Sequence, residues 1–442
     1  MHKRIKIGDL IKQKKAHSQT GPFGTQLKAS EYVDEGIPVI NVRNIGMGDI
    51  RPDNLEFLNI KKANELKSHY LRKNDIVFGR KGAVERHSLI TQKEEGWIQG
   101  SDCIRLRFLT DDFNPKFISF FFRTQTHQQW MINLGSFGAT MGSLNQEIIS
   151  KIEIPDLSKD LQGTIASILS AYDDLIENNN QRIQLLEDMA EEIYKEWFVR
   201  FRFPGYQNTK FLDKNGKEVA HGTKGAIPEG WLEKPIKDLV KIISGYAFKS
   251  DTFEDVGDYK LVTIKNVQNG FFVTETTDCI KELPRGLKKD IFLEDKDILL
   301  SLTGNIGRIC LVYGQNYLLN QRVAKLKPRK DIYFEYTYLF FRSDFLRMTL
   351  ENHSNGAAQQ NLSPVDMSEL KFLTPTDGLI EQCSGITKSF FDEIIILLKK
   401  NQILQETRDL LLPCLISGKL SVEDLEIEKM NMATEPEENY SK

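Results

Sequence analysis

The sequence predicts an α+β fold: two tandem α+β domains separated by two long helices, which pair as an antiparallel coiled coil with pseudo-two-fold symmetry. Three observations lead to this prediction. The chain of 442 residues is long enough for about three structural units at roughly 150 residues each. A set of short motifs recurs in the same order about 220 residues later. Two stretches of about 40 residues carry apolar residues at the 3.5-residue period of a coiled coil.

The internal repeat covers most of the chain. The matching pairs are residues 41–45 with 263–267, 74–77 with 296–299, 97–107 with 317–327, and 172–176 with 391–395. A repeat of this length exceeds a solenoid unit of 20 to 50 residues. The chain therefore reads as two copies of a domain followed by a helix.

The domain boundaries follow from the repeat and from the helix signals. A first globular domain is expected at residues 1–157 and a first spacer helix at 158–203, which begins at a Ser158 cap and stops before Pro204-Gly205. A linker and second domain are expected at 204–378, a second spacer helix at 379–421, and an acidic, disordered tail at 422–442.

The seam of the expected coiled coil is read from alternating steps of three and four residues. The predicted seam residues are Ile165, Leu169, Tyr172, Ile176, Asn179, Ile183, Leu186 and Ile193 in the first helix, and Phe390, Ile394, Leu397, Leu404 and Leu411 in the second. Asn179, Asn401 and Arg408 interrupt the apolar pattern. Such polar residues either fix the register of the pair or mark a solvated or kinked helix.

Within the two globular domains, β-like runs alternate with Gly, Asn and Pro turns. Strands are expected at residues 37–42, 75–78, 259–264 and 297–300, and Phe-rich helices at 115–133 and 333–351. Aromatic residues at helical spacing are usually core. Phe120, Phe121, Phe122, Phe340 and Phe341 are therefore expected in the core and not stacked on bases.

Composition and charge exclude several classes of protein. Apolar residues make up 40% and charged residues 27%, as in folded soluble proteins. No apolar run approaches the roughly 20 residues that span a membrane, and five scattered cysteines fit a reducing cytoplasm without structural zinc. Residues 1–157 carry 23 Lys+Arg against 18 Asp+Glu, whereas 158–200 carry 4 against 9, so two mildly basic blocks alternate with less basic helices.

Several segments resemble one family. They are Gly-Pro-Phe-Gly-Thr-Gln-Leu-Lys at 21–28, Gly-Ser-Phe-Gly-Ala-Thr at 135–140 before Ser143-Leu144-Asn145, Ile-Pro-Glu-Gly-Trp at 227–231, Gly-Ala-Ala-Gln-Gln-Asn-Leu-Ser at 356–363, and Leu-Leu-Pro-Cys-Leu-Ile-Ser-Gly-Lys-Leu at 411–420. Together they resemble the specificity subunits of type I restriction-modification systems over nearly the whole chain. Two places depart from the family pattern: residues 245–249 replace the Gly-Pro-Phe-Gly stretch in the second copy, and the first Ala-Thr segment has Met141-Gly142-Ser143 before Leu144-Asn145.

The resemblance implies a role in DNA recognition. Each of two target recognition domains would read one half of an asymmetric, gapped site on double-stranded DNA. The spacer helices would bind two methyltransferase subunits, and restriction subunits would join the assembly. S-adenosylmethionine, ATP and magnesium would belong to those partners, with no cofactor in this chain. Two different domains held apart by a coiled coil lead to the same expectation of a fixed unread gap.

Base reading requires Arg or Lys toward guanine and Gln or Asn toward adenine, with further polar residues on phosphates. The predicted DNA-binding residues are Thr25, Gln26, Lys28, Arg43, Asn44, Arg80, Lys81 and Arg86 in the first domain, and Lys249, Lys265, Asn266, Thr303, Asn305, Arg308, Gln359, Gln360 and Asn361 in the second.

Catalytic motifs are lacking in the sequence. It has no Pro-Pro pair of an amino-methyltransferase, no G-x-x-x-x-G-K and no H-x-x-x-H, so we expect no catalytic residues and no metal site. Pro52-Asp53 with Glu65-Leu66-Lys67 fits the loose pattern of metal-dependent nucleases, which leaves a nuclease with duplicated DNA-binding domains as the alternative. A protein-only coiled-coil scaffold is the third possibility.

Overall fold

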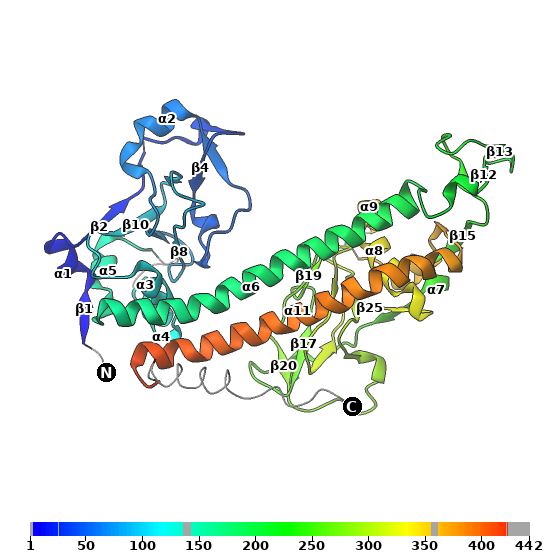
Figure 1. Ribbon diagram of the computed structural model, residues 1–442. Helices are drawn as coiled ribbons and strands as arrows, with labels where there is room; N and C mark the ends of the chain where they lie inside the picture. Colours follow the sequence, from blue (N-terminus) through cyan, green and yellow to red (C-terminus); the bar gives the residue numbers. More distant parts are fainter. Residues whose placement is uncertain (1–2, 25, 136–142, 355–360, 421, 423–442) are drawn as a thin grey trace, which may run out of the picture. The chain divides into compact units, whose positions relative to one another are not determined.

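The computed structural model describes all residues except 1–2, 25, 136–142, 355–360, 421 and 423–442 (Figure 1). The chain divides into two compact units. Unit 1 comprises residues 1–175 and 404–442, and unit 2 comprises residues 176–403. Within the described residues, no helix is long and apolar enough to cross a membrane.

Unit 1 is built on two mixed sheets. The first has the strand order β2-β10-β7-β8-β5, with bounds Ala16–Thr20, Cys103–Phe108, Ile76–Gly79, His87–Leu89 and Met47–Gly48. The second has the order β3-β6-β4-β9, with bounds Tyr32–Val33, Glu56–Leu58, Ile37–Ile40 and Ile98–Gln99. A further pair joins β1 (Arg4–Lys6) to β11 (Glu153–Pro155). The central strand β7 is buried along its whole length, and the first four residues of β10 are buried as well.

Five short α-helices belong to the described part of unit 1. They are α1 (Ile7–Lys12), α2 (Ile60–Glu65), α3 (Pro115–Phe122), α4 (Gln125–Gly135) and α5 (Gln146–Lys151). The predicted core residues Phe120, Phe121 and Phe122 are buried on α3, in one cluster with Phe78 of β7. The placement of these aromatic residues in the core is therefore confirmed.

Unit 2 repeats this plan. One sheet has the order β16-β25-β22-β23, with bounds Val240–Ser244, Val323–Pro328, Ile298–Ser301 and Ile309–Leu311, and a second has the order β20-β17-β24-β21, with bounds Cys279–Ile280, Tyr259–Val262, Tyr317–Leu319 and Phe292–Leu293. Smaller sheets pair β15 (Leu232–Pro235) with β26 (Lys371–Thr374), β18 (Val267–Gln268) with β19 (Phe271–Phe272), and β12 (Phe211–Leu212) with β13 (Glu218–Val219) and β14 (Ile227–Pro228).

The helices of unit 2 also follow unit 1. They are α7 (Ile236–Leu239), α8 (Phe334–Arg342), α9 (Asp344–Ser354) and α10 (Pro364–Glu369). In the first sheet of each unit the equivalent strands pair antiparallel, β7 with β10 in unit 1 and β22 with β25 in unit 2. The second sheet of each unit contains one parallel pair, β4 with β9 in unit 1 and β17 with β24 in unit 2. This equivalence confirms the prediction of two tandem α+β domains.

The two Phe-rich segments differ from the prediction of one helix each. The first is broken between α3 and α4, where the Thr124 hydroxyl donates to the Phe121 carbonyl at 2.7 Å. The second is broken at Ser343, whose extended backbone ends α8 and whose hydroxyl donates to the Phe340 carbonyl at 2.6 Å. In both cases a hydroxyl side chain satisfies a carbonyl at the end of the helix and a new helix begins.

Two long helices connect these elements. They are α6 (Lys159–Tyr194), which continues into a π-helical turn at Lys195–Val199, and α11 (Asp377–Ser417). All thirteen predicted seam residues are buried or half-buried, and none is exposed. In unit 2, Asn179 bonds Asn401 at 2.8 Å and Arg182 pairs with Glu393 at 2.7 Å. A later residue of α6 thus contacts an earlier residue of α11. The helices are therefore antiparallel.

The polar residues in the seam have partners. In unit 2, the Asn179 amide donates to the Asn401 side-chain oxygen, and the Asn401 amide donates to that of Asn180, both at 2.8 Å. In unit 1, Arg408 donates to the Asp173 carboxylate at 2.5 Å. Asn179 and Asn401 are 8% and 6% exposed. This arrangement favours a role in fixing the register over a solvated or kinked helix.

Candidate DNA interface

In unit 1, three segments that are far apart in the sequence meet beside the end of β2. The loop after β2 contains Phe23, and the Arg80 guanidinium lies over its ring at 4.9 Å. Arg80 begins the loop between β7 and β8, and its carbonyl accepts the Leu144 N–H at 2.7 Å, next to a bridge between Lys81 and Ser143. The predicted loop residues and the Ser-Leu-Asn segment are thus brought together.

The turn before β10 supports two of these segments directly. Gly21 donates to the Cys103 carbonyl at 2.9 Å, and a Cβ atom at Gly21 would lie 1.8 Å from the Gly100 carbonyl oxygen. Only glycine fits this close approach. The Arg80 N–H donates to the Asp102 carbonyl at 2.8 Å, so the turn also fixes the loop between β7 and β8.

Unit 2 builds the same arrangement from different residues. Gly245 donates to the Val323 carbonyl at 3.1 Å, and its Cβ would lie 2.0 Å from the Asn320 carbonyl oxygen. Leu302 donates to the Arg322 carbonyl at 2.9 Å and accepts from the Leu362 N–H at 2.9 Å. A bridge joins Thr303 to Asn361, as Lys81 is joined to Ser143 in unit 1. The loop between β22 and β23 and the Asn-Leu-Ser segment therefore meet in unit 2 as well.

The predicted residues of unit 1 are mostly exposed, but several have protein partners. The Gln26 side chain accepts the Phe23 N–H at 3.2 Å, Arg43 pairs with Glu56 at 2.9 Å, and Lys81 lies 3.4 Å from Asp102. Lys28 is exposed and Arg86 is half-buried. Thr25 lies outside the described residues. Of this set, Arg80 and Lys81 lie in the assembly described above.

The predicted residues of unit 2 divide in the same way. Lys249, Lys265 and Asn361 are exposed, and Thr303 is half-buried with its hydroxyl oxygen enclosed and unpaired. Arg308 is half-buried, donates to the Gln268 side-chain oxygen and lies against the Asn305 amide. Gln359 and Gln360 lie outside the described residues.

Asn44 and Asn266 are corrections to the predicted set. Asn44 is fully buried, and its amide donates to the carbonyls of Arg51 and Asp53, both at 3.0 Å. Asn266 is 3% exposed, and its amide donates to the carbonyls of Val273 and Glu275 at 2.9 and 2.8 Å. These two asparagines hold equivalent turns together. A side chain with all of its groups used inside the protein cannot read a base.

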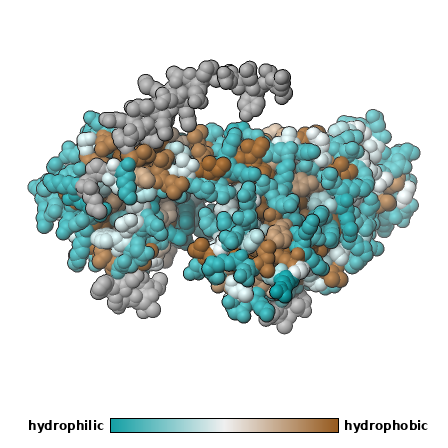
Figure 2. Space-filling model, turned by 90° about the horizontal axis from the view of Figure 1, so that it is seen from below, coloured by the Kyte–Doolittle hydropathy of each residue, from teal (hydrophilic) through white to brown (hydrophobic). Residues whose placement is uncertain are grey.

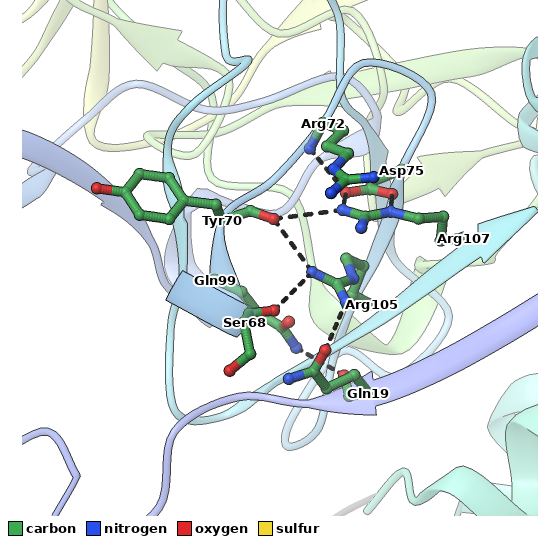
Figure 3. Close-up of polar contacts among 8 residues, drawn as sticks. All are labelled: Gln19, Ser68, Tyr70, Arg72, Asp75, Gln99, Arg105 and Arg107. Carbon is green, nitrogen blue, oxygen red and sulfur yellow. Dashed lines mark hydrogen bonds and ion pairs between the residues drawn. The ribbon is translucent and has the colours of Figure 1, made fainter. Parts of the chain in front are cut away.

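A buried polar network lies behind the loops of unit 1 (Figure 3). Arg105 on β10 is 3% exposed and donates to the carbonyls of Ser68 and Tyr70 at 3.1 Å and to the Gln19 side-chain oxygen at 2.5 Å. Gln99 donates to the carbonyls of Gln19 and Cys103 at 2.8 and 3.0 Å. The network fixes the end of β2, from which the Gly21 loop departs.

Charge in this network is partly balanced. Arg107 donates both a side-chain Nε–H and an Nη2–H to the Asp75 carboxylate at 2.6 Å. Burial and the neighbouring Arg107 charge lower the pKa of Arg105 to about 10, so that Arg105 remains protonated at neutral pH. In unit 2 the equivalent of Asp75, Asp297, pairs instead with Lys325, the equivalent of Arg105, at 2.6 Å. Arg105, Arg107 and Lys325 are thus part of the scaffold.

Sequence analysis missed two features of the assembly. Phe23 and Tyr246 are large exposed aromatic residues, 48% and 40% exposed, in the equivalent loops of the two units. Arg322 is exposed in the turn before β25 and has a positive φ of 72°. The internal repeat aligns Arg322 with Asp102, and this change from an acidic to a basic residue could have identified Arg322 as a candidate from the sequence.

The nuclease alternative receives no support from the site geometry. Asp53 is an exposed turn residue, and Glu65 is exposed on α2, where its carboxylate lies 3.3 Å from the Lys62 ammonium. Among the residues that the structure describes, no cluster of three or more His, Cys, Asp or Glu side chains is arranged to hold a metal ion.

Comparison with known proteins points to one family. The family model described as the type I restriction modification DNA specificity domain matches residues 3–188 and 228–406. The type I restriction enzyme MjaIX specificity subunit of Methanocaldococcus jannaschii is 27% identical over 71% of this chain and 71% of its own length. The HindI specificity subunit of Haemophilus influenzae is 22% identical over 86% of this chain and 94% of its own.

Among solved structures, the type I restriction-modification system S subunit from M. genitalium has a similar fold. It aligns with a TM-score of 0.55 at 16% identity and covers 94% of this chain and 96% of its own. At this identity the likeness concerns the fold alone.

Proposed function

This chain belongs to the type I restriction-modification DNA specificity family, and we propose that its two domains read the two halves of a gapped DNA site, one half each. The observation that carries this proposal is the repeated assembly of three loop segments on an equivalent scaffold, with different side chains in each unit. Equivalent scaffolds place their loops alike, whereas different side chains select different bases.

The candidate contacts are exposed or half-buried polar side chains of the predicted set, together with the exposed rings of Phe23 and Tyr246 in the two assemblies. In unit 1 they are Gln26, Lys28, Arg80, Lys81 and Arg86, and in unit 2 they are Lys249, Lys265, Thr303, Asn305, Arg308 and Asn361. Lysine and arginine at such loops bind phosphates or guanine, and amides bind adenine. Arg43 is a weaker candidate because Glu56 neutralises it.

We assign this chain a recognition role without chemistry of its own. Methyl transfer from S-adenosylmethionine and ATP-driven cleavage with magnesium would be carried out by methyltransferase and restriction subunits bound to it. Apolar side chains on α11, such as Ile396 and Ile403, are 46% and 61% exposed in unit 2 and offer a surface for a partner helix. Figure 2 shows apolar patches between hydrophilic side chains on one face of the molecule.

The test is an in vitro selection from random duplex DNA, using this chain assembled with its methyltransferase partner at near-physiological salt. We expect one enriched motif with two specified halves and a constant unread gap. A continuous motif would contradict the assignment of one half to each domain. Absence of salt-sensitive DNA binding would support a protein-only scaffold instead.

A further inference from the structure

We infer that Arg322 reads a guanine in the half-site of unit 2. This inference rests on the proposed function of the two domains and assigns a specificity role to one side chain. Arg322 lies in the turn between β24 and β25, where its carbonyl accepts the Leu302 N–H at 2.9 Å. The Asn320 carbonyl in the same turn lies against Gly245. Two of the three loop segments therefore contact the turn that carries Arg322.

The backbone of Arg322 is unusual for its residue type. Its φ of 72° lies in the left-handed region, which glycine and asparagine adopt far more readily than arginine. Leu302 needs only the carbonyl of this residue, so a glycine would support the loop equally well. A side chain kept in a conformation that disfavours it indicates a function for that side chain.

The Arg322 side chain is available for a ligand. It is exposed, and within the described part of the chain it makes no hydrogen bond or ion pair. The neighbouring Arg308, by contrast, is held by Gln268 and the Asn305 amide. Arg322 is therefore the free guanidinium beside the loop between β22 and β23.

Comparison of the two units shows a reversal of charge at this position. In unit 1 the equivalent turn residue is Asp102, which lies 3.4 Å from Lys81. In unit 2 the aspartate is replaced by Arg322, and Lys81 is replaced by the neutral Thr303. Both members of the unit 1 ion pair are therefore lost, and in unit 2 the turn carries a positive charge that has no partner among the described residues.

Guanine is the base that this chemistry fits best. A guanidinium donates two parallel N–H groups to the O6 and N7 acceptors of guanine in the major groove, the commonest specific contact between protein and DNA. A phosphate contact would use the same charge but would carry no sequence information. The two cases differ in what a substitution does to selectivity.

The experiment is the selection described above, carried out on the methyltransferase-bound complex with Arg322→Gly, Arg322→Lys and Arg285→Ala. Glycine suits the left-handed backbone, so Arg322→Gly should leave the melting temperature unchanged or higher. We expect it to lose a preference for guanine at one position of one half-site, by about 5- to 150-fold, with the other half and the gap unchanged. Arg322→Lys should retain part of the preference. Arg285→Ala removes an exposed charge elsewhere in unit 2 and should keep the full motif.

Three results would overturn the inference. An unchanged motif in Arg322→Gly would exclude a base-reading role, and equal weakening on all sequences with a smaller salt dependence would assign Arg322 to a phosphate. A half-site without guanine in the wild-type motif would also exclude it. If the wild-type complex selects no bipartite motif, the proposed function itself fails, which is distinguishable because the failure precedes any substitution.

Discussion

Replacing Asn401 with leucine should destabilise the helix pair, although it adds apolar surface to a seam. The substitution leaves the Asn179 amide, 8% exposed, without its acceptor at 2.8 Å and removes the donor to Asn180. A buried amide without a partner costs about 1–3 kcal/mol. Asn180 is exposed and can bond water instead. Burial of the leucine side chain offsets part of the loss, so the net cost is about 1–2 kcal/mol.

The double variant Asn179→Leu with Asn401→Leu should behave differently. Both amides are then absent and two apolar side chains face each other, an exchange that is often neutral or stabilising. The two substitutions should therefore couple by about 1–3 kcal/mol in a double-mutant cycle. Asn178→Leu is the matched control, because Asn178 is an exposed residue on the same turn of α6.

Hydrogen exchange of peptides from α6 and α11 is the suitable assay, because the chain has two units and a single global unfolding transition is not assured. Exchange should be faster in the Asn401→Leu single variant and return toward wild type in the double variant. Equal exchange in Asn401→Leu and Asn178→Leu would mean that water already satisfies the Asn179 amide. A double variant as unstable as the sum of the singles would refute direct pairing.

Two further predictions concern unit 1. Arg105→Met should lower the free energy of opening of unit 1 by about 2–4 kcal/mol, measured by hydrogen exchange of peptides from β2 and β10, because the part-buried acceptors of Ser68, Tyr70 and Gln19 lose their donor. Arg43→Met, which removes an exposed ion pair, should cost at most about 0.5 kcal/mol. Equal effects of the two substitutions would contradict the role of the network. Burial lowers the pKa of His127 from 6.5 to about 3 and that of His87 well below its usual value, so folded unit 1 binds fewer protons than its unfolded form. The stability contributed by each neutral ring is complete above about pH 6.5 and falls below it by up to about 1.4 kcal/mol per pH unit, which melting curves at pH 7.5 and 5.5 would measure. Burial also lowers the pKa of His17 and of His69, so His127→Phe should reduce this acid sensitivity without removing it. An unchanged acid sensitivity would contradict the prediction.

The fold could be predicted largely because its signals are periodic or repeated. The 3.5-residue period locates the buried faces of α6 and α11, and the repeated motifs locate equivalent strands such as β7 and β22. The breaks at Thr124 and Ser343 escaped prediction because one hydroxyl-to-carbonyl bond decides each of them. Such a bond has no periodicity in the sequence.

The candidate interface was harder to predict because exposure is a property of the folded chain. Asn44 and Asn266 belong to a repeated motif and carry the right functional group, yet both use it inside a turn. Arg322 was overlooked because an arginine in the sequence does not indicate a left-handed backbone conformation. In both cases the deciding fact is where a turn directs one side chain.

The way in which the loops are held explains how two domains of one scaffold can select different bases. In unit 1 the loop of Arg80 is fixed by backbone bonds to Asp102 and Leu144, and in unit 2 the loop of Leu302 is fixed by the same bonds to Arg322 and Leu362. Bonds between backbone groups do not depend on side-chain identity. Side chains at these positions can therefore reverse in charge, as from Asp102 to Arg322, without releasing the loop. The side-chain bonds of Asn44 and Asn266, which hold equivalent turns together, lie at a position where both units keep the same residue.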